Sequence, residues 1–187
     1  MPIGWFVDGA YLSRCHSNLD FVKLRERLEA ELGDTVDEGY YFTADTDPPK
    51  QQGFANFLSN QPPIGPGLRP KIYWLTTKQL NWPPHLGGQP VVHPTIPNTV
   101  YQLTQQKAVD VGLAFHMVRS FYKRKWSKLV LCAGDGDFHE PAQSLVEGEG
   151  VDLFIVGKQG TISPNLTSHA KAVFHIDQEP WRTDVTR

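Results

Sequence analysis

Short apolar runs alternate with amphipathic segments along this chain. The runs are rich in β-branched and aromatic residues, and they predict strands at residues 3–7, 39–44, 71–75, 129–133, 151–157 and 172–176. Between them, apolar residues recur at helical spacing in four segments, at 20–32, 49–58, 108–123 and 138–147. This alternation predicts an α/β fold in which helices cover both faces of a mostly parallel sheet of five to six strands.

Two segments rich in proline and glycine, at 61–70 and 81–97, interrupt the alternation. Because the strand pattern continues beyond each of them, we expect surface loops rather than domain boundaries. The chain has 187 residues, which suits one domain with a substantial core. We therefore expect a single domain over 1–187, with a loop insertion at about 81–97.

Composition limits the binding partners and the cellular compartment that we expect for this protein. The formal net charge of −2 gives no overall basic character, so any nucleic-acid binding must come from a local patch. The two cysteines are far apart, and Cys132 falls in a predicted core strand, so we expect no disulfide and a reducing compartment. Neither a signal peptide nor a bilayer-spanning run is recognisable, so we expect a cytoplasmic protein with no membrane association.

Carboxylates follow two of the predicted strands. Asp8 comes directly after the first strand, and Asp135 and Asp137 follow the strand at 129–133, one glycine apart. Ligands of open α/β sheets bind at the carboxyl ends of the strands. Closely spaced carboxylates usually persist where a cation or a shared proton offsets their repulsion. The alternative is that one of the pair caps the helix that follows, although a cap requires only one acid.

A fourth acid, Asp110, lies near the start of the helix predicted at 108–123. At helical spacing it shares a face with Leu113 and Met117, which directs it toward the core. The alternative is a first-turn acid that the helix dipole favours. The adjacent Lys107 could bind a substrate phosphate or form a salt bridge to one of the acids. Clustered carboxylate oxygens suit Mg²⁺ or Mn²⁺.

Three segments of the chain each contain one or two of these acids: FVDGAYL at 6–12, KAVDVGLA at 107–114 and AGDGDF at 133–138. They resemble the signature blocks of the NYN domain family of PIN-like nucleases. The resemblance implies a Rossmann-like three-layer sandwich and a metal-dependent ribonuclease that hydrolyses phosphodiester bonds. By position, the catalytic and metal-binding acids would be Asp8, Asp110, Asp135 and Asp137. Single-stranded RNA is the expected substrate, with DNA as a second candidate, and such compact nucleases often form homodimers.

The chain departs from this family pattern at two positions. Tyr11 stands where many members carry Asn, and His116 stands where members often have a further acid, so the site could bind metal more weakly or prefer manganese. Two other functions remain. One is a non-catalytic module that binds RNA or protein. The other is a phosphatase of the haloacid dehalogenase type, whose nucleophilic Asp would have to occupy the position of Phe6.

The segment 119–128 gathers five cations among aromatic residues. It could bind phosphates or stack a base. The alternative is the cationic end of a helix, favoured by the dipole, with Phe121 and Trp126 packed inward. Because the segment precedes the strand at 129–133, we expect it at the edge of the sheet opposite the acids.

Overall fold

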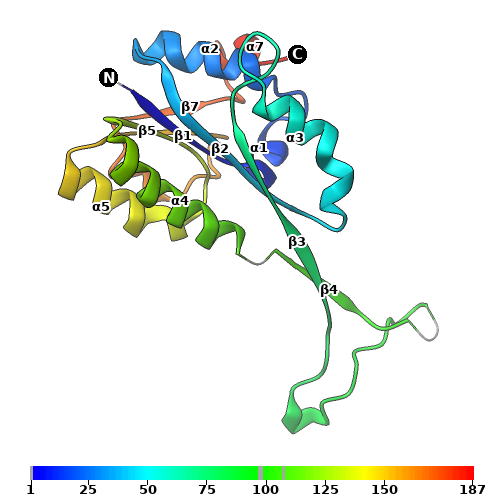
Figure 1. The fold of residues 1–187 in the computed structure, drawn as a ribbon. Coiled ribbons are helices and arrows are strands. Elements are labelled where there is room, and N and C mark those ends of the chain that lie inside the picture. Colours follow the sequence, from blue (N-terminus) through cyan, green and yellow to red (C-terminus); the bar gives the residue numbers. More distant parts are fainter. Residues whose placement is uncertain (1, 97–98, 107) are drawn as a thin grey trace.

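The computed structural model describes residues 2–96, 99–106 and 108–187. Within these ranges, one sheet of seven strands runs in the order β4-β3-β2-β1-β5-β6-β7 (Figure 1). The strands are β1 Ile3–Asp8, β2 Val36–Asp45, β3 Arg69–Gln79, β4 Gln102–Gln106, β5 Lys128–Cys132, β6 Asp152–Gly157 and β7 Ala172–His175. Neighbouring strands are parallel except β3 and β4. The α/β class is therefore confirmed, whereas the expected count of five to six strands was too low.

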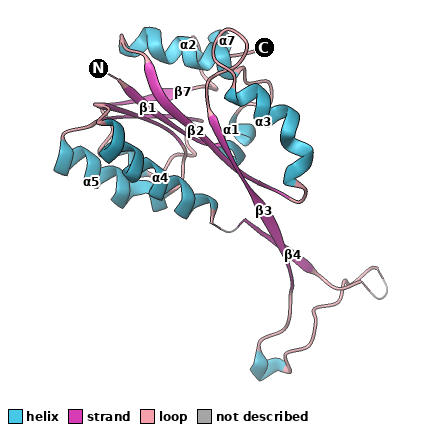
Figure 2. Cartoon of the chain, viewed as in Figure 1, coloured by secondary structure: helices cyan, strands magenta, loops and turns pink. Residues whose placement is uncertain are grey.

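Helices cover both faces of the sheet and make three layers (Figure 2). The first layer holds α1 Gly9–Cys15, α2 Phe21–Leu32, α3 Gln52–Ser59 and α7 Trp181–Asp184, and the second holds α4 Val109–Arg124, α5 His139–Glu149 and α6 Pro164–Thr167. Single-turn 3-10 helices are η1 Pro48–Gln51, η2 Pro84–Leu86 and η3 Gly136–Phe138. None of the helices in the described part of the chain combines the length and the apolarity that crossing a bilayer requires.

The central strand β1 is buried on both faces. Trp5 and Val7 pack into the core under α1 and α2, whereas Phe6 packs into the core under α4 and α5. This follows from the alternation of side chains along a strand, and a strand covered on both sides reads as a continuous apolar run. Both cysteines are free thiols, as expected, and the Trp5 Nε1–H donates to the Cys132 Sγ at 3.1 Å.

The order of the strands creates a switch point in the sheet. From β1 the chain moves outward through β2 and β3, and it later returns to the other side of β1 with β5, β6 and β7. The order of the sheet thus reverses between β1 and β5. In open α/β sheets, ligands bind at the carboxyl ends of the strands at such a switch point.

The connection between β3 and β4 projects from the body of the molecule as an arm (Figure 1). Its base is the antiparallel pairing from Leu75↔Gln106 to Gln79↔Gln102. The insertion expected at about 81–97 lies beyond this pairing, and its described residues contain η2 and the isolated bridge Asn81↔Pro90. The structure therefore extends the insertion with paired strands on either side, which the sequence pattern did not indicate.

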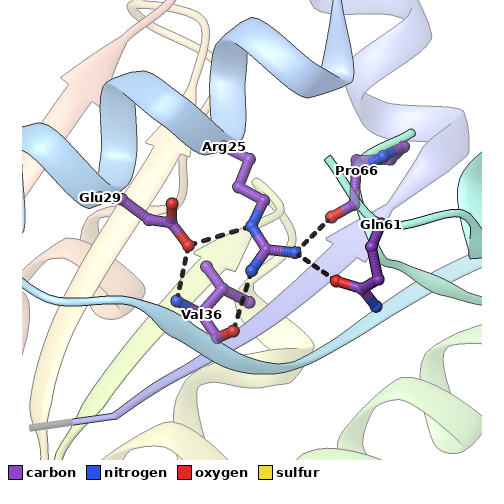
Figure 3. A network of polar contacts seen from close by, with 5 residues as sticks. All are labelled: Arg25, Glu29, Val36, Gln61 and Pro66. Carbon is purple, nitrogen blue, oxygen red and sulfur yellow. Dashed lines mark hydrogen bonds and ion pairs between the residues drawn. The ribbon is translucent and has the colours of Figure 1, made fainter. Parts of the chain in front are cut away.

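A buried arginine ties three segments together at the other end of the sheet (Figure 3). Arg25 of α2 is 8 % exposed, and its guanidinium donates to the carbonyl oxygens of Val36 at 3.0 Å and Pro66 at 2.8 Å. It also pairs with Glu29 at 3.0 Å, and the Glu29 carboxylate accepts from the Val36 N–H at 2.8 Å. These bonds hold the start of β2 and the segment before β3 against α2.

Candidate active site at the acidic edge

Asp8 ends β1 and begins α1. Its side chain Oδ1 accepts a hydrogen bond from the Tyr11 N–H at 2.9 Å, which caps the helix. The residue is 7 % exposed. Burial raises the pKa of Asp8, the Tyr11 N–H lowers it, and the charge of Asp110 raises it further. Asp8 is therefore a buried acid that is held in place by a backbone bond and repelled by a neighbouring acid.

Asp135 and Asp137 lie just beyond β5, the parallel neighbour of β1. The Asp135 Oδ1 accepts from the Asp137 N–H at 3.0 Å and caps η3, so the capping role weighed from the sequence exists. Asp137 lies within η3, and both side chains are exposed. Within the described residues, the cap accounts for Asp135, whereas the carboxylate of Asp137 has no hydrogen-bond or ion-pair partner.

Asp110 occupies the first turn of α4 and is half-buried, on the same face as Leu113 and Met117, which are fully buried. Burial raises the pKa of Asp110, and the charges of Asp135 and Asp137 raise it further. The charge of Asp110 also raises the pKa of Asp8. Asp110 is therefore the acid that interacts electrostatically with the other three.

The four acids belong to the same edge of the sheet but do not form a preorganised metal-binding site. Across the described residues, no three His, Cys, Asp or Glu side chains are grouped so that they could hold a metal ion. The donor chemistry nevertheless fits a hard divalent cation, because carboxylate oxygens are its preferred ligands and mutual repulsion is what a cation would relieve. Lys107, the candidate phosphate-binding residue, lies outside the described residues.

Tyr11 is a residue of this region whose contacts were not foreseen. Its hydroxyl is 2.9 Å from the Thr161 Oγ1 and accepts from the Lys158 N–H at 3.2 Å, so it joins α1 to the loop after β6. A Cβ added at Gly134 or at Gly157 would overlap the Tyr11 side chain. Two glycines at the ends of β5 and β6, opposite a buried tyrosine, are the signal that could have revealed this packing.

Comparison with known proteins adds a family to this geometry. The NYN domain model matches residues 2–177, nearly the whole chain. The chain belongs to the NYN domain family. NYN domains are nuclease-related, so the chain has a nuclease-like fold, and the resemblance of its three acidic blocks is confirmed at the level of the family.

A solved structure shows the same fold. The crystal structure of a protein of unknown function from Vibrio parahaemolyticus aligns with a TM-score of 0.61 at 15 % sequence identity. The alignment covers 100 % of this NYN chain and 96 % of that chain. A search of curated proteins finds no match. The similarity in structure therefore supports the fold and leaves the activity to the site itself.

The second departure from the family pattern, His116, lies in the middle of α4. Its ring is 5.0 Å from that of Tyr40 and 5.7 Å from that of Phe42. Burial lowers the pKa of His116, and the charges of Lys71 and Arg119 lower it further. The imidazole is therefore biased toward its neutral form, and it lines a cationic cavity instead of supplying a further acid.

Proposed function

We propose that this NYN domain is a nuclease that uses Mg²⁺ or Mn²⁺ to hydrolyse phosphodiester bonds in single-stranded RNA. The observation that carries the proposal is the position of mutually repelling acids at the switch point of the sheet. Family membership supports the nuclease class.

The electrostatics of the edge favour a bound cation. Among the described residues, none of the four acids forms an ion pair with lysine or arginine. The raised pKa values of Asp8 and Asp110 mean that their ionised forms are disfavoured in the folded chain. A divalent cation would remove this penalty, and the exposed side chains of Asp135 and Asp137 have room to turn toward it.

Each acid has a role in the proposed reaction. Asp8 and Asp135 would hold the central ion, while Asp110 and Asp137 would complete the site or orient the attacking water. A bound ion supplies a water of lowered pKa and a positive charge that stabilises the departing oxygen. The phosphatase alternative is disfavoured, because Phe6 occupies the position of the required nucleophile and is fully buried.

The test is cleavage of a labelled single-stranded RNA with magnesium, with manganese and with EDTA. Asp8→Asn and Asp135→Asn are the informative variants, because Asn is as good a helix cap as Asp and only the charge is lost. Since loss of an outer-shell partner typically costs 10–100-fold, loss of a metal ligand should cost more than about 100-fold. Asp37→Asn, an exposed acid near the start of β2, is the matched control and should retain full activity.

Two results would contradict the proposal. Equal activity in the wild type and in both Asn variants would indicate a contaminating nuclease. RNA binding without cleavage under every divalent ion would identify a non-catalytic binding module.

A further inference from the structure

A second charged site lies on the α4 face of the sheet. It is a cavity of about 350 Å³ between β2, β3 and α4. Five of the side chains that line it are cationic: Arg69, Lys71, Arg119, Lys123 and Arg124. We propose that this cavity, which we call the cationic cavity, binds phosphate groups of a single-stranded RNA. The choice of RNA rests on the proposed function.

The negative charge inside the cationic cavity is already neutralised. Glu38, whose side chain is 5 % exposed, accepts hydrogen bonds from the Tyr40 hydroxyl at 3.1 Å, from the Ser120 hydroxyl and from Arg69. Burial would raise the pKa of Glu38, but the bonds from Ser120 and Tyr40 and the charge of Arg69 hold it below its usual value. Glu38 is thus an ionised partner that forms its ion pair with Arg69, and the charge of Arg124 also lowers its pKa.

The remaining four cations have no carboxylate partner. Across the part of the chain that the structure describes, Lys71, Arg119, Lys123 and Arg124 form no ion pair. Other cations of the same segment are paired instead, Lys125 with Glu149 at 3.8 Å and Lys128 with Asp34. Four of the five cations that line the cavity are therefore left without an ion pair, as expected for a site that receives an anion.

The helix dipole does not explain this arrangement by itself. It favours cations in the last turn of α4, which accounts for Lys123 and Arg124. Arg119 lies more than a turn earlier, and Lys71 comes from β3. Lys71 and Arg119 line the same cavity as His116, whose pKa their charges lower. Convergence from two elements indicates a binding site.

The size and walls of the cationic cavity favour a nucleotide over a small inorganic anion. Its volume is in the range of sites that enclose organic ligands. The rings of Tyr40 and His116 lie 5.0 Å apart in the wall and offer apolar area to a base. At 1.5 Å per helical residue, Arg119 and Lys123 lie roughly 14–20 Å along α4 from Asp110. An RNA strand several nucleotides long would reach from the acidic edge to the cavity.

The test measures RNA binding in EDTA, so that it is independent of cleavage. The probe is a fluorescein-labelled 15-nucleotide oligouridine, and its affinity is measured by anisotropy over a range of KCl concentrations. In the double variant Arg119→Gln/Lys123→Gln, the slope of log affinity against log salt should become shallower by about 1.4, at about 0.7 per lost contact with a single strand. The affinity should fall as well. Because the changed side chains are exposed and unpaired, the thermal midpoint should stay near that of the wild type.

Two controls separate charge from other effects. Lys50→Gln removes a cation that lies outside the cationic cavity and is paired only with Asp47, so it should leave the slope unchanged. Arg119→Lys/Lys123→Arg keeps both charges and should restore binding. A double variant whose slope and affinity match those of Lys50→Gln would overturn the proposal. A second result would also overturn it. If Arg119→Gln/Lys123→Gln lost binding of pyrophosphate but bound RNA as tightly as the wild type, the cavity would serve a small phosphorylated ligand instead of RNA. Failure of cleavage alone would refute the proposed function and leave this test intact.

Discussion

Replacing Tyr11 by Asn, the residue that many NYN domains carry there, should destabilise this chain. The Tyr11 ring is 7 % exposed and occupies the space that Gly134 and Gly157 leave open at the ends of β5 and β6. Asn would leave much of this space empty and would bury an amide without the present hydroxyl partners. The packing around position 11 therefore requires a side chain of about the size of tyrosine.

The magnitude follows from two contributions. Tyr11→Phe removes only the hydroxyl, so it loses the bond to Thr161 and leaves the Lys158 N–H without its acceptor, at a cost of about 1–3 kcal/mol. Tyr11→Asn removes the ring as well as the hydroxyl, and comparable losses of a whole buried aromatic side chain cost about 3–5 kcal/mol in total. At about 2–4 °C per kcal/mol for a chain of this size, Asn should lower the melting temperature by about 6–20 °C.

Equilibrium unfolding in urea, with thermal unfolding in parallel, measures both variants against the wild type. Tyr122→Asn is the matched control, because Tyr122 is 56 % exposed and should tolerate the change with little shift of the midpoint. If Tyr11→Asn were no less stable than Tyr11→Phe, the ring would contribute nothing, and our account of the two glycines would be refuted.

Three further predictions concern charge. Arg25→Leu should lower the free energy of unfolding by about 2–5 kcal/mol, because it leaves the Val36 and Pro66 carbonyls without a donor. The control Lys23→Gln, on the same helix, should stay near the wild type. Equal urea midpoints for the two variants would mean that the Arg25 network does not stabilise the fold. In EDTA, Asp110→Asn should be more stable than the wild type, since the raised pKa of Asp110 means that its ionised form opposes folding. This gain should fade as the pH falls from the raised pKa toward the ordinary value of 3.8, and it should be absent below 3.8, where the carboxyl is protonated in both states. Manganese at a hundred times its dissociation constant should stabilise the wild type by about 2.7 kcal/mol and Asp110→Asn by less. If Asp110→Asn were less stable than the wild type in EDTA, the account of the Asp110 charge would be refuted.

Apolar runs located the body of the sheet, because parallel strands buried on both faces must be continuously apolar. The sequence did not predict β4, because Gln102–Gln106 contains a single apolar residue and so shows no apolar run. This strand pairs with the outer half of β3. The helix α1 was missed because it has only seven residues, and its cap, Asp8, was considered only as a site residue. A pattern of burial does not reveal an element that is too short or too polar to show a period of its own.

The acids could be singled out in the sequence because Asp8 ends the strand β1, Asp135 lies three residues beyond β5 and Asp110 lies in the first turn of α4. The cationic cavity was not, since it joins Glu38, Lys71 and Arg119 from three elements that only the tertiary fold brings together. The inward packing expected of Phe121 and Trp126 is confirmed, at 4 % and 0 % exposure. The same segment nevertheless divides its cations between ion pairs and the cavity, which a linear count of charges could not separate.

The helix α4 connects the two charged sites, and its charge pattern explains why they can be tested separately. Asp110 lies in its first turn and Lys123 and Arg124 lie in its last, which is the favourable order for a helix dipole at both ends. Neutral substitutions at one end should therefore leave the other end in place. If RNA binds as proposed, α4 sets the direction of the strand, with the scissile phosphate at Asp110 and the distal phosphates at the cationic cavity.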